Sequence, residues 1–386
     1  MLHNKKVLVI MGEGKLLGQQ RANIQVFHTL RSEGITPLFI LGLREETDEI
    51  VNHLAKLDFK FERILFAELF NKGMGFIKAL KNILCLVKSN FYLLRQLIKL
   101  KPGYIHITNE INFRNFFPVL FLAFKPIIYR IGDTPRQHHW IFRFIWKILI
   151  IPLTKKFICV SEYVKRILIQ AGANEKNIRV VYSFPPVRSD KLFKSNNTLE
   201  RVKDDYNLVF IGQITNEKGI HLLIEACIEL FNQHKKVNLL IAGSFNPEFG
   251  LHEELIEKVK MFDLEDRILF LGTVENIEEV FSVSKLHICP SIWEEPLSNT
   301  VMEAKSYSLP SVIFKSGGLP EVINHKIDGY ICSNKTSISL AEGIVYFIKD
   351  SERTNIAGKE ANKSLERLGV TPEAFKKKWS EIYENK

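Results

Sequence analysis

Short apolar runs alternate with longer amphipathic stretches along most of the chain. In the first half, the apolar runs that we predict as β-strands are 6–11, 36–41, 104–107, 127–131, 157–160 and 178–182. The amphipathic stretches that we predict as helices are 20–33, 75–100, 140–150 and 162–170. Strands that alternate with helices in this way indicate βα units and a parallel sheet.

A second series of such units begins after residue 206. Its predicted strands are 207–211, 238–242, 268–271, 286–290 and 310–314. Its predicted helices are 220–231, 251–261, 277–283, one from about 300, 319–324 and, at the end of the chain, 372–383. Residues 183–205 interrupt the pattern with Pro185-Pro186, a Ser-Asn-Asn run and many charges, which is typical of a linker.

These patterns predict an α/β protein with two doubly wound domains. The expected parts are an N-terminal domain (1–190), a linker (191–206), a C-terminal domain (207–370) and a final helical segment (371–386). Doubly wound domains bind ligands at the carboxyl ends of their strands. We therefore expect the two domains to face each other across a ligand-binding cleft.

Composition and charge narrow the classes of partner. The 386 residues are 46% hydrophobic and 25% charged, as in a globular protein, and the net charge is +10. Residues 1–190 hold 29 Lys and Arg against 14 Asp and Glu, whereas residues 191–386 hold 24 against 29. A basic first half suits an anionic membrane surface or an anionic substrate. Nucleic acid is the rival interpretation, but zinc-ligand spacing, an RNA-recognition aromatic motif and a clear helix-turn-helix are all missing from the sequence.

The cysteines and the start of the chain indicate a cytoplasmic protein. Five cysteines are scattered without a CxxC pair, so reduced thiols are the simplest account. The first residues predict a β-strand and not a signal peptide. The strongest candidate for a membrane span, 140–153, is too short, and it carries Arg143 and Lys147.

Two basic apolar stretches leave alternatives open. Residues 140–153 form either a buried helix or a helix in the membrane interface, with Trp140, Phe142, Phe144 and Trp146 immersed and Arg143 and Lys147 at the headgroups. Residues 75–100 are a basic amphipathic stretch, which fits either a solvated face or a membrane-facing one.

A pair of carboxylates in the second half is the main candidate for chemistry. Glu295 lies in a loop that follows a predicted strand. Glu303 comes after seven intervening residues, about a turn inside the next helix. A helix N-terminus binds phosphate through its unpaired N–H groups, and carboxylates nearby must accept hydrogen bonds from neutral hydroxyls. A sugar linked to a nucleoside through a diphosphate meets both demands.

Three strand-to-helix loops could carry phosphate contacts, although each also fits an ordinary turn. In 212–219, Lys218 could neutralise a diphosphate, with Gly212 and Gly219 admitting a close backbone approach. In 12–20, Gly18 could place N–H groups near a phosphate, but the glycine spacing is not GxGxxG. The third loop is 316–321.

From Asn207 to about Cys332 the chain resembles the catalytic domain of the family-4 retaining glycosyltransferases. The segments that carry the resemblance are Phe210-Ile211-Gly212, Lys218-Gly219, Ile241-Ala242-Gly243, Phe270-Leu271-Gly272, the E-x7-E pair after Pro290-Ser291, Leu309-Pro310 and Gly317-Gly318-Leu319-Pro320-Glu321. The first half is similar more loosely, at Leu17-Gly18, 157–162 and 178–182. The resemblance implies a GT-B fold of two Rossmann-like domains.

The resemblance also implies roles for single residues. Glu303 would bind the ribose hydroxyls and Glu295 the donor sugar, while Lys218 would stabilise the diphosphate leaving group. The further residues implied in nucleotide-sugar binding are Gly18, Gln213, Gly243, Val274, Ile277, Leu297, Ser298 and Asn299. The last helix would cross back onto the first domain.

Two departures from the family pattern matter. The family usually has Arg where this chain has Gln213, so Lys218 carries more of the leaving-group charge, or Arg136 helps. A His that often follows the fifth strand is absent, and Asp133 or His138 would take its place. Structural turn roles for Asp133 and the histidines stay open.

The sequence therefore predicts a retaining glycosyltransferase that moves a sugar from a UDP- or GDP-sugar to a glycan or lipid-linked acceptor. Asp133, Lys218 and Glu295 are the candidate catalytic residues. The candidates for contact with acceptor or membrane are Arg136, His138, Trp140, Arg143 and Lys147. We expect no cofactor and no metal, because the sequence lacks a DxD tripeptide.

The expected setting is bacterial capsule, O-antigen or other surface-polysaccharide assembly, in the cytoplasm or at the cytoplasmic face of the membrane. Partners would be the nucleotide sugar, the acceptor and, peripherally, an anionic membrane, but not nucleic acid. Two alternatives remain: a sugar-nucleotide 2-epimerase of the same fold, and a non-catalytic subunit of a glycosyltransferase complex.

Overall fold

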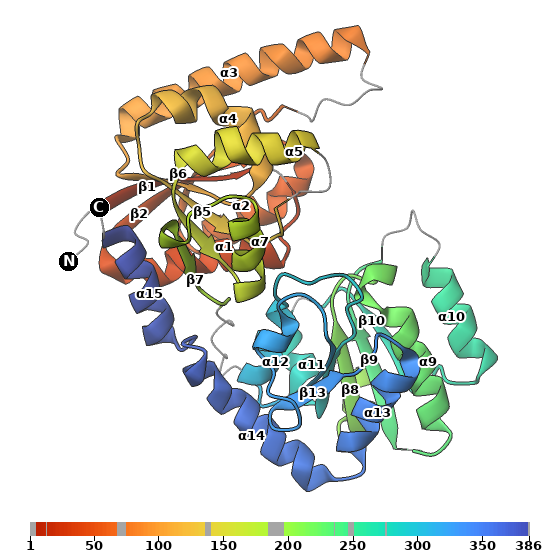
Figure 1. Cartoon of the computed structure of the whole chain (residues 1–386). Coiled ribbons are helices and arrows are strands. Elements are labelled where there is room, and N and C mark those ends of the chain that lie inside the picture. Colours follow the sequence, from red (N-terminus) through yellow and green to blue (C-terminus); the bar gives the residue numbers. More distant parts are fainter. Residues whose placement is uncertain are drawn as a thin grey trace. The chain divides into compact units, whose positions relative to one another are not determined.

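The chain forms two compact units (Figure 1). The structure is a computed structural model that describes residues 5–12, 14–67, 75–135, 140–183, 197–234, 236–245, 251–274 and 276–384. Unit 1 comprises Met1–Phe184 and Pro372–Lys386, and unit 2 comprises Pro185–Thr371. The first unit thus ends earlier than residue 190, where we expected its boundary.

Among the described residues, unit 1 contains one parallel sheet of seven strands in the order β3-β2-β1-β4-β5-β6-β7. The strands are β1 (Lys5–Gly12), β2 (Ile35–Gly42), β3 (Lys60–Ile64), β4 (Tyr104–Ile107), β5 (Ile127–Ile131), β6 (Thr154–Cys159) and β7 (Ile178–Val180). β1 is an inner strand, third in that order, and its residues from Val7 to Gly12 are all buried, because helices cover both faces of the sheet.

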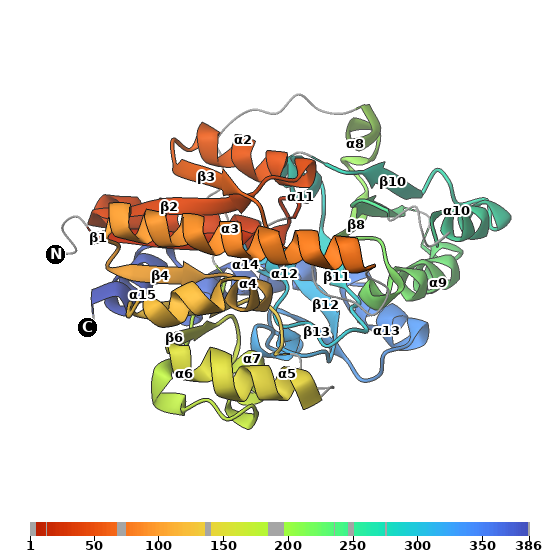
Figure 2. The ribbon, with the colours of Figure 1, turned by 90° about the horizontal axis from the view of Figure 1, so that it is seen from above.

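The helices of unit 1 form two layers. They are α1 (Gly18–Leu30), α2 (Asp48–Lys56), α3 (Phe76–Leu100), α4 (Glu110–Leu122), α5 (Trp140–Ile145), α6 (Ile151–Leu153), α7 (Glu162–Gln170) and α15 (Pro372–Glu384). A π-helical segment, Trp146–Ile150, continues α5 into α6. Helices α1, α2 and α15 supply side chains to one core cluster with β1 and β2, and α3 and α4 pack together on the other side of the sheet (Figures 1 and 2).

The last helix, α15, is an integral part of unit 1. Its Trp379 and Tyr383 are fully buried, and the Tyr383 hydroxyl lies 2.8 Å from Nδ1 of His106 in β4. Two lysines also donate to its final carbonyls: Lys5 to Tyr383 O and Lys156 to Ile382 O, both at 2.8 Å. These contacts join the end of the chain to its first sheet.

Unit 2 contains, in its described residues, a parallel sheet of six strands in the order β10-β9-β8-β11-β12-β13. The strands are β8 (Tyr206–Ile211), β9 (Val237–Ala242), β10 (Ile268–Gly272), β11 (Leu286–Cys289), β12 (Ser311–Phe314) and β13 (Gly329–Cys332). Its helices are α8 (Asn197–Val202), α9 (Ile220–Phe231), α10 (Leu251–Met261), α11 (Ile277–Ser282), α12 (Asn299–Ser306), α13 (Ser337–Ile348) and α14 (Ser351–Arg367).

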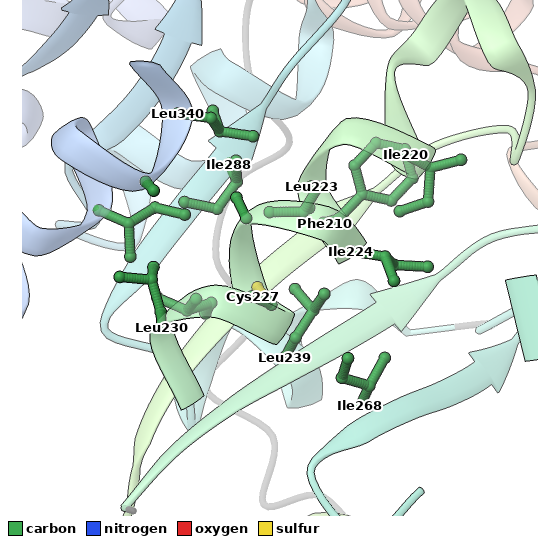
Figure 3. Packing of buried hydrophobic residues seen from close by; sticks show 14 of the residues in the cluster. Phe210, Ile220, Leu223, Ile224, Cys227, Leu230, Leu239, Ile268, Ile288 and Leu340 are labelled. Atoms are coloured by element: carbon green, nitrogen blue, oxygen red, sulfur yellow. The ribbon is translucent and has the colours of Figure 1, made fainter. Parts of the chain in front are cut away.

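The two faces of this second sheet carry separate cores. Leu208 and Phe210 of β8 point to a cluster formed with α9, α10 and α13, whereas Val209 points to a cluster with α8, α11 and α12. Figure 3 shows the first cluster, in which Leu223 and Cys227 of α9 pack among side chains of the sheet. This alternation is what a strand buried on both faces requires.

Two predicted elements were wrong. Residues 319–324 form only a 3-10 turn (Leu319–Glu321), because Pro320 lies in it and the chain then turns through Asn324. Part of the predicted linker is helix α8, which is anchored by the buried side chains of Leu199 and Val202. A single apolar pair among charged residues is too weak a pattern to indicate a helix.

Candidate functional site

The order of the strands in unit 2 reverses between β8 and β11. β9 lies beside β8 on one side and β12 beside β11 on the other, so the connections leave these two neighbouring strands in opposite directions. In an open α/β sheet, ligands bind outside the carboxyl ends of the strands at such a switch point. The loops that follow β8 and β11 are the ones in which we predicted Lys218 and Glu295.

The loop after β8 needs glycine where it enters α9. Gly219 has a φ of 71°, and a Cβ atom there would lie 1.9 Å from the carbonyl oxygen of Pro290. No side chain fits at this distance, so the backbones of the two loops touch at Gly219. Lys218 directly precedes it in a 3-10 turn, and Gln213 is exposed earlier in the loop.

Backbone hydrogen bonds hold the two loops together. The N–H groups of Ile292 and Trp293 both donate to the carbonyl oxygen of Glu217, at 2.8 and 3.1 Å. The loop after β12 joins them, because the N–H of Gly318 donates to the carbonyl oxygen of Glu295 at 2.8 Å. Three loops from three adjacent strands therefore form one rigid edge.

Lys218 and Glu295 form an ion pair at this edge. The ammonium donates to both carboxylate oxygens, at 2.9 and 2.7 Å, and the Ser291 hydroxyl donates to Oε2 at 3.0 Å. The Glu295 side chain is 12% exposed and that of Lys218 is 30% exposed. We predicted both residues as donor contacts, but we did not predict that they bind each other, nor that Ser291 takes part.

A second lysine–glutamate pair lies next to the first. Lys335, after β13, donates to Glu294 Oε1 and to the carbonyl oxygen of Ile292, both at 2.8 Å. The N–H of Gly317 donates to Glu294 Oε2 at 2.6 Å. Desolvation opposes ionisation of Glu294, but these hydrogen bonds outweigh it and lower the pKa of the carboxyl group.

The sequence analysis missed Glu294, Lys335 and Ser291. Glu294 and Glu295 are adjacent in the sequence, but only Glu295 belongs to the E-x7-E pair. Lys335 is distant in sequence and follows an edge strand, so only the order of strands in the sheet brings it to Glu294.

Glu303 lies on α12, which starts at Asn299 directly after the Glu295 loop. Leu297 and Ser298 are buried and Asn299 is half-buried, so the helix start is packed against the unit. The Ser298 hydroxyl lies 2.9 Å from the Thr300 hydroxyl, and it does not cap the helix. Glu303 is half-buried. The geometry thus places the start of α12 and both predicted acids on one continuous segment.

A buried ion pair fixes α12. Lys305 has no exposed side-chain surface, and it lies 3.2 Å from Asp328 Oδ2 while donating to the Ser364 hydroxyl at 2.9 Å. Desolvation lowers the pKa of Lys305, and Asp328 acts in the opposite direction. The pair links α12 to the turn before β13 and to α14, two residues beyond Glu303.

The other predicted nucleotide contacts are distributed around the same edge. Gly243 follows β9, and a Cβ atom there would lie 1.7 Å from the carbonyl oxygen of Gly212, so packing alone already requires glycine. Val274 and Ile277 flank the start of α11, where both pack against the core cluster on that face of the sheet. A role in binding for these residues stays a prediction.

The predicted residues of unit 1 lie in several places. Gly18 is the exposed first residue of α1, and Asp133 is exposed after β5. Trp140, Arg143 and Lys147 are exposed on α5 and its π-helical continuation. Arg136 and His138 lie outside the described residues.

For this helix we left two alternatives open, and the structure contradicts the membrane-interface alternative at Trp146. Trp146 is buried and donates its Nε1 hydrogen to Glu110 Oε2 at 3.1 Å, so it is not available to enter a membrane. Within the parts of the chain that the structure describes, no helix is long and apolar enough to cross a membrane. The same described residues contain no cluster of three His, Cys, Asp or Glu side chains arranged to hold a metal ion.

Comparisons with known proteins assign a family to most of unit 2. A family model for glycosyl transferases group 1 matches residues 193–364. YtcC of Bacillus subtilis (strain 168) is 29% identical over 234 residues, which cover 56% of this chain and 57% of that protein. The N-acetyl-alpha-D-glucosaminyl L-malate synthase of Bacillus anthracis is 28% identical over 197 residues, 49% of each protein. The chain thus spans about half the length of these curated relatives.

A solved structure extends the likeness to the whole chain. Anabaena HepE, in complex with UDP and glucose, has a TM-score of 0.80 with 18% identity, covering 99% of this chain and 100% of HepE. At that identity the likeness concerns the fold alone. Residues 193–364 therefore form a domain of the glycosyl transferases group 1 family, in a chain that has the GT-B fold with two Rossmann-like α/β units.

Proposed function

We propose that this protein is a glycosyltransferase that uses a nucleotide sugar as donor and retains the configuration at the anomeric carbon. The observation that carries the proposal is the interlocked edge of unit 2, where Lys218, Glu295 and the start of α12 lie at a switch point. The family of residues 193–364 supports it, as does the UDP–glucose complex of HepE.

In this proposal the donor binds along that edge. The N–H groups at the start of α12 and the Lys218 ammonium face the diphosphate, while Glu303 accepts hydrogen bonds from the ribose hydroxyls. Glu295 accepts hydrogen bonds from hydroxyls of the sugar. The bond between the anomeric carbon and the diphosphate oxygen breaks, and Lys218 stabilises the charge that develops on the leaving group.

The Lys218–Glu295 pair has a consequence for this mechanism. In the present structure the carboxylate of Glu295 already accepts three hydrogen bonds, two from Lys218 and one from Ser291. An incoming diphosphate would compete for the ammonium, and sugar hydroxyls would then replace it on the carboxylate. The pair thus holds both side chains in place until the donor arrives.

The acceptor hydroxyl attacks the same face of the anomeric carbon from which the diphosphate leaves. Its oxygen bonds to that carbon, and its proton passes to the departing phosphate oxygen. We assign no nucleophile to the protein, and Asp133 would position the donor or the acceptor. UDP and GDP are the expected nucleotides, and the proposed reaction uses no metal and no cofactor.

The proposed acceptor is a glycan or lipid-linked saccharide of a bacterial surface polysaccharide, such as capsule or O-antigen. The excess of positive charge on residues 1–190 supports an acceptor held near an anionic membrane on its cytoplasmic side. Arg136, His138, Trp140, Arg143 and Lys147 are the proposed contacts with acceptor or membrane.

A donor screen followed by two substitutions tests the proposal. A panel of UDP-, GDP- and dTDP-sugars is screened for thermal stabilisation, since a ligand at one hundred times its Kd adds about 2.7 kcal/mol of apparent stability. Turnover of the donor that binds is then measured in the Lys218→Ala and Glu303→Ala variants. Each should lower turnover by more than about tenfold, or about 1.4 kcal/mol of transition-state stabilisation.

Lys359→Ala and Glu366→Ala serve as matched controls, because both residues are exposed on α14 of the same unit. Unchanged turnover in both site variants would exclude this site. Incubation with donor alone would yield an epimer if the protein is a 2-epimerase. Donor binding without turnover by any acceptor would favour a non-catalytic subunit.

A further inference from the structure

Helix α3 of unit 1 exposes a stripe of large apolar side chains. The side chains of this stripe follow one another at intervals of three, four or seven residues, so they share one face of the helix. The α3 stripe consists of Ile77, Leu80, Leu84, Val87, Phe91 and Ile98, all of them exposed. Phe91 is 72% exposed and Phe76, at the start of the helix, is 83% exposed. Figure 1 shows α3 as the outermost helix on its side of unit 1.

The opposite face of α3, which packs on the protein, carries several polar residues. The buried residues of α3 are Asn82, Ser89 and Gln96, together with Leu93 and Leu97. The Ser89 hydroxyl donates to the carbonyl oxygen of Leu65 at 2.5 Å, and the neighbouring Asn90 donates to the carbonyl oxygen of Asn115 in α4 at 2.7 Å. Most of the large apolar side chains of α3 thus point away from the protein, unlike those of an ordinary surface helix, and core packing does not explain the α3 stripe.

The charges on α3 all have the same sign. Residues 76–100 contain no Asp or Glu, and the basic residues among them are exposed: Lys78, Lys81, Lys88, Arg95 and Lys99. Over residues 76–161 there are fourteen Lys and Arg against only Glu110 and Asp133. The exposed apolar stripe is therefore bordered by positive charge.

Neighbouring helices extend the same surface. The end of α4 and the turn after it expose Phe121, Leu122 and Phe124, and α5 with its continuation exposes Trp140, Phe144 and Ile148. Figure 2 shows α3, α4 and α5 side by side, on the side of unit 1 that faces the viewer. Apolar patches of this extent on a water-soluble surface mark an interaction site.

We propose that α3 is a bilayer-docking helix, which lies in the interface of an anionic phospholipid membrane with the α3 stripe immersed and its lysines and Arg95 at the headgroups. A helix of 25 residues is roughly 37 Å long, and its cations and apolar side chains occupy the positions that such a helix requires. This inference deepens the proposed function by assigning its membrane contact, and it rests on that function only for the role of the membrane as the place of the acceptor.

Neither a second copy of the chain nor a nucleic acid matches both the charge and the apolar side chains of this surface. A second copy of the chain would bring two basic surfaces together, which costs free energy at low salt. A nucleic acid duplex would be attracted to the cations, but its charged exterior offers no apolar surface for Leu84, Val87 and Phe91 to bury against. An anionic bilayer satisfies both features at once.

The experiment measures sedimentation of the full chain with vesicles of phosphatidylcholine alone or with phosphatidylglycerol. The apolar variant is Val87→Ser with Phe91→Ser, and the charge variant is Lys81→Gln with Lys88→Gln and Arg95→Gln. The matched controls lie on exposed positions of unit 2: Met261→Ser with Phe262→Ser, and Lys349→Gln with Lys359→Gln and Lys363→Gln.

We expect the native chain to bind the anionic vesicles, and each α3 variant to bind at least about tenfold more weakly. The controls should bind like the native chain. In Phe91→Trp, the added fluorescence should be quenched by brominated lipid, and in Met261→Trp it should not. Since no sugar transfer is measured, failure of the proposed reaction would leave these results unchanged.

Three results would overturn the proposal. The first is a native chain that does not sediment with anionic vesicles. The second is an apolar variant that binds as well as the native chain, because adsorption would then be electrostatic only. The third is a native chain that elutes as a dimer and becomes monomeric with Val87→Ser and Phe91→Ser, because the stripe would then be covered by a second copy.

Discussion

The two units repeat one structural device at equivalent places in their sheets. His106 lies in β4, next to β1, and His287 lies in β11, next to β8, so each occupies the strand across the switch point from the first strand of its unit. Each ring is fully buried with Nδ1 beside a hydroxyl, that of Tyr383 at 2.8 Å and that of Ser311 at 3.0 Å. Burial lowers the pKa of both rings to about 3, with Arg130 adding to the effect at His106.

The units differ in what surrounds these similar sheets. In unit 2 the loops at the carboxyl ends of the strands are tied by backbone hydrogen bonds and by two lysine–glutamate pairs. In unit 1 the distinctive feature is a helical surface, on which α3 turns apolar side chains outward. The family model covers the loops of unit 2 but not α3. One scaffold thus carries a fixed loop edge in one unit and a docking surface in the other, and function follows those additions and not the fold.

The largest expected effect concerns the buried ion pair of unit 2, which has no counterpart among the ion pairs described in unit 1. Asp328→Ala leaves Lys305 buried without its carboxylate, and breaking a buried pair in this way costs about 3–5 kcal/mol. Hydrogen exchange, measured separately for each peptide of the chain, should be faster in α12 and α14 and unchanged in β1 and α15.

Asp266→Ala is the control for that change, because Asp266 forms an exposed pair with Arg201. Equal effects of the two substitutions would mean that the Lys305–Asp328 pair contributes no more than a surface pair. Faster exchange in unit 1 as well would mean that the two units unfold together, which would weaken the contrast between them.

The shared histidines predict the same response to pH in both units. Each ring is neutral when folded, with a pKa near 3, and takes up a proton below about pH 6.5 when unfolded. The unfolded state therefore binds more protons between these values, and stability is present above about pH 6.5 and lost as the pH falls. Each histidine should cost about 2 kcal/mol between pH 6.5 and pH 5.

Chemical denaturation at several pH values, with exchange followed in each unit, measures this loss. His28→Ala, at an exposed position on α1, is the control and should leave the slope unchanged. A loss confined to one unit would show that the two histidines differ in spite of their equivalent positions.

The sequence predicted the repeated βα pattern and most of the strands, since buried parallel strands are short apolar runs with clear borders. It missed the strands β3 and β13 and the helices α2, α4, α13 and α14. In α4 and α13, nearly continuous apolar residues such as Phe116-Phe117 hide the helical period. The roles of Lys218 and Glu295 came from a motif. Their mutual contact, and the pair of Glu294 with Lys335, depend on loops that meet only after the sheet has formed.

The pattern of apolar and polar residues also could not predict which face of α3 packs on the protein. Its apolar period was visible, but an apolar stripe ordinarily faces the core. Here Ser89 and Asn90 donate hydrogen bonds to the carbonyl oxygens of Leu65 and Asn115 on the protein side, and the stripe faces outward. The period of the apolar residues shows which side chains share a face of the helix. Which face packs on the protein depends on the hydrogen-bond partners of the polar side chains.

The smallest expected effects compare one helix cap in each unit. Ser161 accepts a hydrogen bond from the N–H of Val164 at the start of α7, and Thr336 accepts one from Ser339 at the start of α13, both at 3.2 Å. Ser161 is fully buried and Thr336 is exposed, so water can replace only the second. We expect Ser161→Ala to cost about 2 kcal/mol and Thr336→Ala about 0.5 kcal/mol.

Urea unfolding of the two variants measures the difference, with Ser337→Ala as the control, since Ser337 follows the cap of α13 and does not itself serve as one. The contrast rests on burial and not on the unit in which the cap lies. Equal losses would therefore mean that the amide freed by Ser161→Ala finds another acceptor. A larger loss at Thr336 would mean that the start of α13, close to Lys335 and its carboxylate partner, carries more of the stability of unit 2 than its exposure indicates.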